Sequence, residues 1–518
     1  MRGALVALGA AALALHLVLA LPARPGAALP ALARLPAELP VLLALLCLTG
    51  RAGRIVATLA LGGLAMLKLA DLAMQSSLGR AFNPVADLPL IDAALRLIAG
   101  SLGRPAALGA ALAAGLAALA ILWLIWRATG AWSARPWRGG QRVVAALAGG
   151  AMLAAMAGQQ IRADNAAYAA ARLALAQRTL AELRDLRQTA ARDPFAGRTG
   201  LLSAIDRDVL VIFVESYGRT SFDTDPYAAS HLPTLRRAEA RLAQAGLAMR
   251  SGFLTAPTQG GQSWLSHATF ANGLWISDQT RHRALLASGR QSLFHHARRA
   301  GFRTAAVMPA ITRPWPEAAR MGFDRVLAAA DLGYRGQPFN WVTMPDQFTL
   351  AATDRLLREG RDERRLFAQV ALISSHAPWT PVPRMLPWEA IGDGRAFDAM
   401  AAEGDPPRVV WQDRDRVRRQ YRAAIDYALQ AALDYAARQG PEAPLILLLG
   451  DHQAAPTIAL DDRPDVAMHV IGPAALVDRA AAWGFAPGLV PAPGSATLPM
   501  DAMRDLILGG FGDDGAPA

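Results

Sequence analysis

The sequence predicts an α-helical polytopic membrane domain followed by an α/β domain with a largely parallel central sheet. The first part of the 518-residue chain is rich in Ala and Leu and nearly free of charge, whereas the rest has a mixed composition. The later part alternates apolar runs of strand length with helix-like stretches, and this alternation is typical of α/β proteins.

Five apolar stretches in the first part predict five transmembrane helices, because most of them approach the ~20 residues needed to cross a bilayer. We interpret the first as a span rather than a cleaved signal peptide, since four more follow it. Lys68 and Asp71 lie near one end of the third stretch, where a long side chain can extend to the interface. The stretches lie at roughly 4 to 21, 37 to 50, 55 to 74, 106 to 126 and 143 to 159.

The placement of Arg residues predicts the orientation of this membrane domain. Arg2, the loop with Arg51 and Arg54, and the Arg-rich loop at 127–142 share one side, which we take as cytoplasmic. An odd number of spans then places the chain after about residue 160 outside the cytoplasmic (inner) membrane of a bacterium. We expect a transmembrane domain at 1–160, an amphipathic juxtamembrane linker helix at 161–200 and an extracytoplasmic catalytic domain at 201–518.

Charge and cysteine content exclude some classes of protein. The net charge is +11, but the Arg residues are scattered and accompany no nucleic-acid motif, so we expect no nucleic-acid partner. Cys47, the single cysteine, lies in an apolar stretch, so the chain can form neither an intrachain disulfide nor a cysteine metal cluster. Any metal must therefore use oxygen and imidazole ligands.

Polar residues directly follow three of the predicted strands. Glu215 ends the run VIFVES, His376 ends ALISSH, and Asp451 and His452 end LLLGDH. Ligands of open α/β sheets bind at the carboxyl ends of strands. A single carboxylate after a strand is as often a helix cap, but three repeats of the same placement favour a functional site.

These residues suggest a metal and a nucleophile. Glu215, Asp451 and His452 offer the carboxylate and imidazole ligands that a hard or borderline divalent cation prefers. Ser263 follows a Gly-Gly pair, which lets the backbone approach a ligand, and precedes a predicted helix. A metal at its oxygen would lower the pKa of the hydroxyl and allow attack on phosphorus. The alternative role for Ser263, a helix N-cap, is compatible with this one.

The complete set of motifs resembles the alkaline phosphatase superfamily, and within it the membrane-bound branch that contains lipoteichoic acid synthases and related phosphoglycerol transferases. The resemblance rests on the five-span N-terminus, FVESYGR at 213–219, GQS before Asn272 in NGL, SSHAPW at 374–379 and LGDH at 449–452. Together these features cover essentially the whole chain.

The resemblance implies a role for each strand-end residue. Glu215, Asp451 and His452 would bind one divalent metal ion, and Ser263 would be the nucleophile and an additional ligand. His376 would contact the substrate phosphate or help to protonate the leaving group. The ligand set suits manganese and zinc equally.

In the same branch a Trp and an Arg between the nucleophile and the His hold the phosphoglycerol headgroup. The nearest candidates here are Arg313 and Trp315, whose order and spacing differ from the family pattern. A conventional sulfatase would need a C/S-x-P-x-R signature for formylglycine, but the chain has QSWLSH around Ser263. Phosphoethanolamine transferases usually carry disulfides, which this chain cannot form.

We therefore expect an enzyme that transfers a phospholipid headgroup, phosphoglycerol from phosphatidylglycerol, to a membrane-associated glycan or lipid acceptor through a phosphoserine intermediate. A phosphodiesterase or phosphatase with the same metal and nucleophile is an alternative, as is a phosphoethanolamine transferase. A non-catalytic envelope protein is disfavoured by the complete set of candidate residues.

Five other features have structural interpretations beside or in place of functional ones. His267, one helical turn after Ser263, could reach the site, but we interpret it as a structural residue and leave it out of the metal set. We interpret His295 and His296 as surface residues of a helix. The guanidinium of Arg219 has two equally favoured partners, a substrate phosphate and a carboxylate in a salt bridge within its own loop. The remaining features are Asp346, interpreted as a helix N-cap, and the irregular segment 384–412, interpreted as a lid, an acceptor-binding element or a disordered loop.

Overall fold

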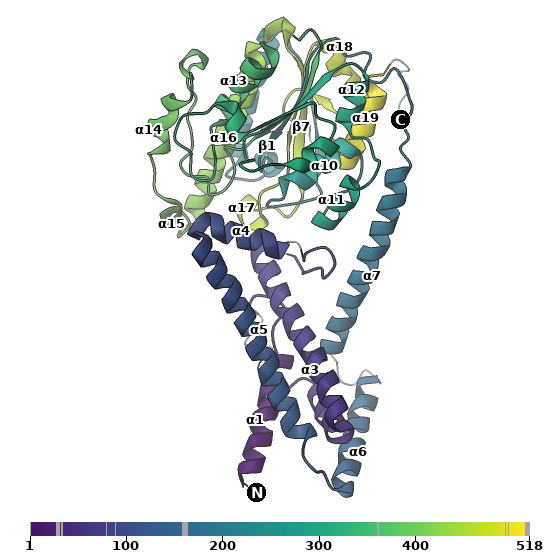
Figure 1. Cartoon of the computed structure of the whole chain (residues 1–518). Helices are drawn as coiled ribbons and strands as arrows, with labels where there is room; N and C mark the ends of the chain where they lie inside the picture. The colour runs from purple at the N-terminus through teal and green to yellow at the C-terminus, as the bar shows by residue number, and fades with distance from the viewer. Residues whose placement is uncertain are drawn as a thin grey trace. The chain divides into compact units, whose positions relative to one another are not determined.

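The computed structural model describes residues 2–26, 32, 35–78, 80–88, 90–157, 164–359, 362–492, 494–495 and 497–512. These residues form two compact units, Met1–Arg184 and Asp185–Ala518. Figure 1 shows that the first unit is helical and that the second combines helices with a sheet. The predicted fold class is confirmed.

The first unit consists of apolar helices. Among the described residues, three segments are long and apolar enough to cross a membrane, namely Glu38–Ser76, Arg104–Ser133 and Gly139–Ala157, and the apolar helix Leu5–Leu19 is shorter. The helices of this unit are α1 (Arg2–Leu19), α3 (Glu38–Leu78), α4 (Leu90–Leu102), α5 (Arg104–Ser133) and α6 (Gly139–Ala157), followed by α7 (Asp164–Ala191), which continues into the second unit.

Helix α3 reverses its direction at Gly50. The φ and ψ of Gly50, 60° and −136°, are not helical. Glu38 accepts a hydrogen bond from the backbone N of Asn165 at 2.7 Å, and Lys68 donates to the side-chain oxygen of the same Asn165 at 2.6 Å. A straight helix would separate residues 38 and 68 by about 45 Å. The two predicted stretches at 37–50 and 55–74 are therefore two antiparallel halves joined by a glycine turn.

Lys68 and Asp71 are buried and do not extend to an interface as expected. Lys68 is 6% exposed and donates to the carbonyl of Leu19 as well as to Asn165. Asp71 is 1% exposed and accepts hydrogen bonds from the backbone N of Phe82 and from the Tyr168 hydroxyl. Both side chains thus hold parts of this unit together, because a buried charge is tolerated only with such partners.

The second unit contains a mixed sheet that is mostly parallel. Within the described residues it has nine strands in the order β4-β3-β5-β1-β6-β7-β2-β8, with β9 beside β2. β1 pairs in parallel with β5 and β6, whereas β7 runs antiparallel to both β6 and β2. The strands are β1 (Val209–Val214), β2 (Ala248–Thr255), β3 (Arg303–Met308), β4 (Arg325–Ala328), β5 (Leu366–Leu372), β6 (Leu445–Gly450), β7 (Asp465–Gly472), β8 (Ala486–Pro487) and β9 (Thr497–Pro499).

The central strand β1 is buried on both faces, which explains its continuous apolar sequence. Successive side chains of a strand point to opposite faces. Leu210, Ile212 and Val214 belong to one hydrophobic core, and Val209, Val211 and Phe213 belong to the other. The strands predicted from VLVIFVES, RTAAVMP, LFAQVALIS and PLILLLGDH are all present.

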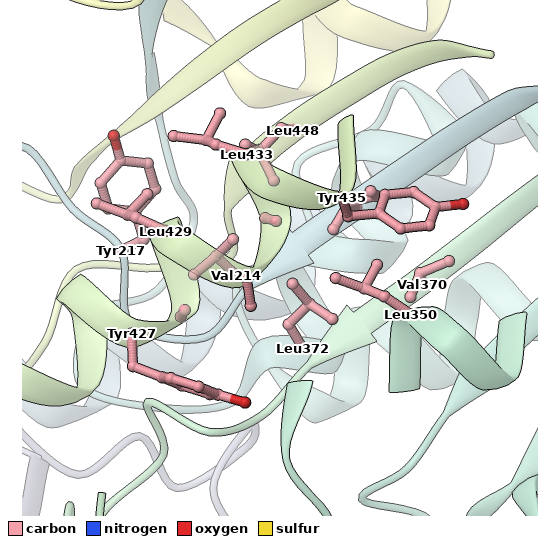
Figure 2. Packing of buried hydrophobic residues seen from close by; sticks show 14 of the residues in the cluster. Val214, Tyr217, Leu350, Val370, Leu372, Tyr427, Leu429, Leu433, Tyr435 and Leu448 are labelled. Carbon is pink, nitrogen blue, oxygen red and sulfur yellow. The ribbon is translucent and has the colours of Figure 1, made fainter. Parts of the chain in front are cut away.

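Helices cover both faces of the sheet (Figure 1). Helices α9, α13 and α16 contribute to the first core, and α10, α12 and α19 to the second. Figure 2 shows the first core, in which Tyr427, Leu429 and Leu433 of α16 surround side chains of the central strands.

The remaining helices connect these layers. The α-helices of the second unit are α8 (Thr220–Asp223), α9 (Ala228–Gln244), α10 (Ser263–Asn272), α11 (Gln279–Leu286), α12 (Leu293–Arg299), α13 (Asp346–Thr353), α14 (Asp398–Ala401), α15 (Pro407–Val410), α16 (Arg414–Arg438), α17 (Pro456–Ala459), α18 (Ala474–Val477) and α19 (Met503–Gly510). The shorter helical turns are η1 (Pro316–Arg320), η2 (Ala329–Leu332), η3 (Asp354–Arg358), η4 (Trp388–Ala390), η5 (Arg395–Phe397), η6 (Gly440–Glu442), η7 (Asp478–Trp483) and η8 (Met500–Ala502). The irregular segment 384–412 thus contains four short helical turns.

We expect Gly450→Ala to destabilise the second unit, because a Cβ at this position would lie 1.8 Å from the carbonyl oxygen of Tyr217. The main chain would have to move, at a cost of about 2 kcal/mol or more. Thermal unfolding of the full chain in detergent measures the effect. Gly510→Ala is the matched control, since its Cβ would meet its nearest neighbour, in Trp483, at 3.4 Å. Equal stability of the two variants would contradict the expectation.

Candidate metal and nucleophile site

The candidate site lies where the carboxyl ends of three adjacent parallel strands meet. Glu215 follows β1, the pair Asp451 and His452 follows β6, and His376 follows β5 after a short turn. The register pairs Val214 with Gly450, so the next residue of each strand, Glu215 and Asp451, is carried to the same place. The structure therefore brings together the three strand ends singled out in the sequence.

Asp451 is fixed by backbone amides of its own turn and of the turn after β1. Its Oδ1 accepts hydrogen bonds from the backbone N of Ser216 at 2.8 Å and of His452 at 2.7 Å. Ser216 has a φ of 59°, in the left-handed region, and this conformation turns its N–H toward Asp451. The other oxygen, Oδ2, lies 3.8 Å from Nε2 of His452.

The ring of His452 presents one nitrogen to the carboxylates. Its Nδ1 lies 3.0 Å from the carbonyl oxygen of Gln453, which can only accept, so Nδ1 carries a proton and donates. Nε2 lies 3.2 Å from Oε1 of Glu215. Such a bond on the far nitrogen orients a metal-ligating histidine.

Ser263 is the first residue of α10 and points at these ligands. Its Oγ donates to Oε2 of Glu215 at 3.0 Å and lies 3.3 Å from Nε2 of His452. The helix N-cap is Gln262, with a φ of 68°, so the interpretation of Ser263 as the N-cap is wrong. Gly260, with a φ of 76°, donates its N–H to the Gln453 carbonyl at 2.7 Å and holds the loop before Ser263 in place.

The electrostatics of the cluster are those of two carboxyl groups buried side by side in the protein. Burial and the neighbouring Glu215 raise the pKa of Asp451 to about 7. Burial alone would lower the pKa of His452, but Asp451 and Glu215 raise it to about 9. Burial opposes ionisation of Glu215 as well, yet His452 holds its pKa below the usual value. The cluster therefore attracts positive charge.

The three donors fit a divalent metal ion. One ligand atom from each of Glu215, Asp451 and His452 lies within 4.8 Å of the other two, and all three residues are buried. A metal-binding imidazole must be neutral, so a cation here would replace the proton of His452 and balance the two carboxylates. The oxygen and nitrogen donors suit a hard or borderline cation. The oxygen of Ser263 faces the same space, as its distances to Glu215 and His452 show.

His376 lies at the same edge of the sheet, on the exposed rim of the site. Its Nδ1 donates to the Ala377 carbonyl at 2.6 Å, so Nε2 is the nitrogen that can exchange a proton. After His452, His376 is a further cause of the lowered pKa of Glu215. The preceding Ser375 anchors the turn, because its hydroxyl donates to the Glu215 carbonyl at 2.6 Å.

Asp346 supports the turn before His376 and is not the N-cap of α13. The N-cap is Pro345, whereas Oδ1 of Asp346 accepts from the backbone N of Ile373 at 2.7 Å and of Ser374 at 2.9 Å. Burial raises the pKa of Asp346 to about 6. In the sequence, a carboxylate between a Pro and a helix indicated an N-cap. The anchoring role of Asp346 could not be seen there, because its partner Ile373 is 27 residues away in the chain.

Arg313 and Trp315 lie in the loop that follows β3, another strand whose carboxyl end is at this edge. Arg313 is exposed, and Trp315 is partly buried against the second core. Their assignment to the substrate headgroup stays a prediction.

The other weighed residues have structural environments. His267 is fully buried, with its ring 4.1 Å from that of Phe213. Arg219 forms ion pairs with Asp223 at 3.2 Å and Asp465 at 3.4 Å. These contacts agree with the salt bridge that was one of the two roles considered for it.

The expectation that both His295 and His296 are surface residues is wrong for His296. His296 is 1% exposed and its Nε2 lies 2.9 Å from the guanidinium of Arg504, because α12 packs this side against the second core. Its neighbour His295 closes a capping box with Ser292 at the start of α12.

Comparison with known proteins gives a family. The family model described as Sulfatase matches residues 207–467, which is half of the chain. The chain therefore belongs to the sulfatase family and is an enzyme of the alkaline phosphatase superfamily. No curated protein matches the sequence significantly.

Several solved structures resemble part of the chain. The lipoteichoic acid synthase LtaP from Listeria monocytogenes is 14% identical with a TM-score of 0.36, and the match covers 56% of this chain and 71% of that one. The phosphoglycerol transferase GacH from Streptococcus pyogenes is 13% identical with a TM-score of 0.37 and coverages of 65% and 92%. The periplasmic domain of phosphoethanolamine transferase EptC from Campylobacter jejuni is 12% identical with a TM-score of 0.37 and coverages of 59% and 89%.

We expect Glu215→Gln and Asp451→Asn to lose bound metal, because each removes a charged ligand from the cluster. Metal analysis of the purified full chain should show affinity lowered by more than about tenfold. Chelation should lower the unfolding temperature of the native chain and leave that of the variants unchanged, since bound metal stabilises only the folded state. Asp478→Asn, which neutralises an exposed carboxylate paired with Arg250, is the control and should retain the metal.

We expect Asp346→Ala to destabilise the second unit by about 2 to 3 kcal/mol, because two buried backbone N–H groups lose their acceptor. Asp346→Asn should cost much less, since its amide oxygen can replace Oδ1, and Oδ2 has no hydrogen-bond partner within the described parts of the chain. Thermal unfolding of both variants tests this, and an equal loss in the two would contradict the anchoring role.

Proposed function

We propose that the protein transfers the headgroup of a membrane phospholipid, phosphoglycerol from phosphatidylglycerol, to a membrane-associated glycan or lipid acceptor. The observation that carries the proposal is the position of the Ser263 hydroxyl, 3.0 Å from Glu215 and 3.3 Å from His452. A candidate nucleophile oxygen thus lies beside three buried residues that could hold a metal. The sequence after Ser263 lacks the Pro and Arg of a formylglycine signature. This favours an unmodified serine, and phosphoryl transfer over sulfate ester hydrolysis.

Glu215, Asp451 and His452 would hold one manganese or zinc ion, with Ser263 as a further ligand. When bound, such an ion supplies Lewis-acid stabilisation of negative charge and lowers the pKa of a nearby hydroxyl. Glu215 orients Ser263, because its Oε2 accepts the hydroxyl hydrogen bond.

The first half of the reaction forms a covalent intermediate on Ser263. Its Oγ, with the proton lost to solvent, attacks the phosphorus of the phospholipid, and the bond from phosphorus to the diacylglycerol oxygen breaks. His376 protonates the leaving oxygen through Nε2, since its Nδ1 is held by the Ala377 carbonyl. The phosphoglycerol then remains on the serine oxygen.

The second half returns the enzyme to its starting state. His376 takes the proton of an acceptor hydroxyl as the acceptor oxygen attacks phosphorus, and the bond from phosphorus to Oγ breaks. Ser263 regains a proton from solvent. Arg313 offers a guanidinium on the loop after β3 for the substrate phosphate, and Trp315 offers a ring for the glycerol.

Membrane anchoring supports a lipid donor, because an enzyme and a lipid held in one bilayer meet in two dimensions. The apolar helices of the first unit supply the anchor. We propose five crossings, with α3 contributing two of them through its turn at Gly50, which would place the domain at 201–518 outside the cytoplasmic membrane of a bacterium. The chain at 161–200, which includes α7, would connect the 1–160 membrane domain to it.

The test uses phosphatidylglycerol labelled in its glycerol headgroup. The full chain in detergent with manganese or zinc is expected to release diacylglycerol and move the label to an acceptor or to the protein. Ser263→Ala should lower this release by more than about a thousandfold, as loss of a covalent nucleophile does. Ser230→Ala on α9 is the control and should retain activity.

The outcomes separate the alternatives. Label released only as free glycerol phosphate would identify a hydrolase with the same site, and turnover of labelled phosphatidylethanolamine alone would identify a phosphoethanolamine transferase. Full activity of Ser263→Ala would overturn the nucleophile assignment.

A further inference from the structure

A cavity of about 310 Å³ lies at the end of α10 opposite to Ser263. Ala268 and Asn272 of α10 line one side, and α11, the loop at 287–291 and Arg320 line the others. Nine residues of helix place Asn272 about 13 Å along the axis from Ser263. The cavity is therefore distinct from the metal and nucleophile cluster.

The lining of this cavity is cationic. It includes Arg290 and Arg320, while Asp and Glu are absent from the lining residues that the structure describes. Arg290 is already engaged, because Nε donates to the Asn272 carbonyl at 2.9 Å and Nη1 lies 3.7 Å from Asp193. Arg320 is exposed and donates to the Leu286 carbonyl at 3.1 Å, which leaves most of its donors for a ligand.

Two buried polar atoms of lining residues lack a partner within the described part of the chain. They are Nδ1 of His282 and Oε1 of Gln291. His282 is only 8% exposed, and burial lowers the pKa of its ring against the opposing influence of Glu317, so the ring is mostly neutral at pH 7. Oε1 of Gln291 can only accept, and a buried acceptor without a donor is unfavourable, so a ligand that donates to it would be stabilised.

We propose that this cavity binds a small polyhydroxylated anion, a polyol phosphate or sugar phosphate. The guanidinium of Arg320 suits the phosphate, because its donors match the spacing of two oxygens. The unpaired atoms of His282 and Gln291 suit hydroxyl groups, which donate and accept. The volume lies at the small end of the range for ligand pockets and admits one such unit rather than a lipid.

Binding in this cavity does not require a reaction at Ser263, so the test uses an enzyme in which that reaction is abolished. The full chain with Ser263→Ala, in detergent and with chelator, is titrated by calorimetry with glycerol phosphate, glucose 1-phosphate, glycerol and inorganic phosphate. At least one of the two phosphate esters is expected to bind about tenfold or more tighter than glycerol and inorganic phosphate, since only the esters engage both kinds of partner.

Arg320→Gln locates the binding in the cavity and should weaken it by about tenfold or more. Arg325→Gln is the matched control, because this exposed Arg of β4 also donates to a main-chain carbonyl, that of Leu356 at 3.0 Å, but does not line the cavity. Arg320→Lys should lose less than Arg320→Gln, as it retains the charge.

Three results would overturn the proposal. They are no saturable binding of either ester, inorganic phosphate binding as tightly as the esters, and equal affinities of the Arg320→Gln and Arg325→Gln proteins. Thermal unfolding of each variant accompanies the titrations, so that a loss of binding is assigned only to folded protein. Activity of the Ser263-containing enzyme on phosphatidylglycerol is a separate measurement, and its failure would leave these outcomes unchanged.

Discussion

The rest of the site depends on one constraint, namely that the carboxyl groups of Glu215 and Asp451 are buried close to each other. The parallel register of β1 and β6 forces them together, and burial leaves their charge without solvent. His452 opposes that charge, and the amides of the two turns fix Asp451 in place. Such an arrangement favours a bound cation, and the hydroxyl of Ser263, which donates to Glu215, lies beside the same groups.

The sequence predicted the parts of the fold that follow from local patterns. The apolar runs of β1, β3, β5 and β6 identified the parallel sheet, because strands buried on both faces carry no polar alternation. Since parallel strands end at one edge, the sequence alone predicts that Glu215, Asp451 and His452 lie together, and in the structure their ligand atoms lie within 4.8 Å of one another. Ser263 was found because it follows a Gly-Gly pair and precedes a predicted helix. In the structure both of these glycines, at 260 and 261, have positive φ values.

Features that depend on distant contacts were not predictable. Asp346 resembled a helix cap, and only the fold shows that its acceptor serves backbone amides of the turn after β5. His296 follows a helical pattern with Arg neighbours, but Asp193 and Arg504, far away in the sequence, surround it. The reversal at Gly50, by contrast, was predictable, because the loop with Arg51 and Arg54 separates the apolar stretches at 37–50 and 55–74.

The main-chain carbonyl of Gln453 has a consequence for how the site responds to change. It accepts hydrogen bonds from Nδ1 of His452 and from the N–H of Gly260, so one oxygen joins the orientation of a metal ligand to the loop that carries Ser263. Substitutions in that loop will therefore alter the ligand as well, and their free energies will not add to those of ligand substitutions. The candidate nucleophile and the candidate metal ligand are therefore coupled in free energy through this one oxygen.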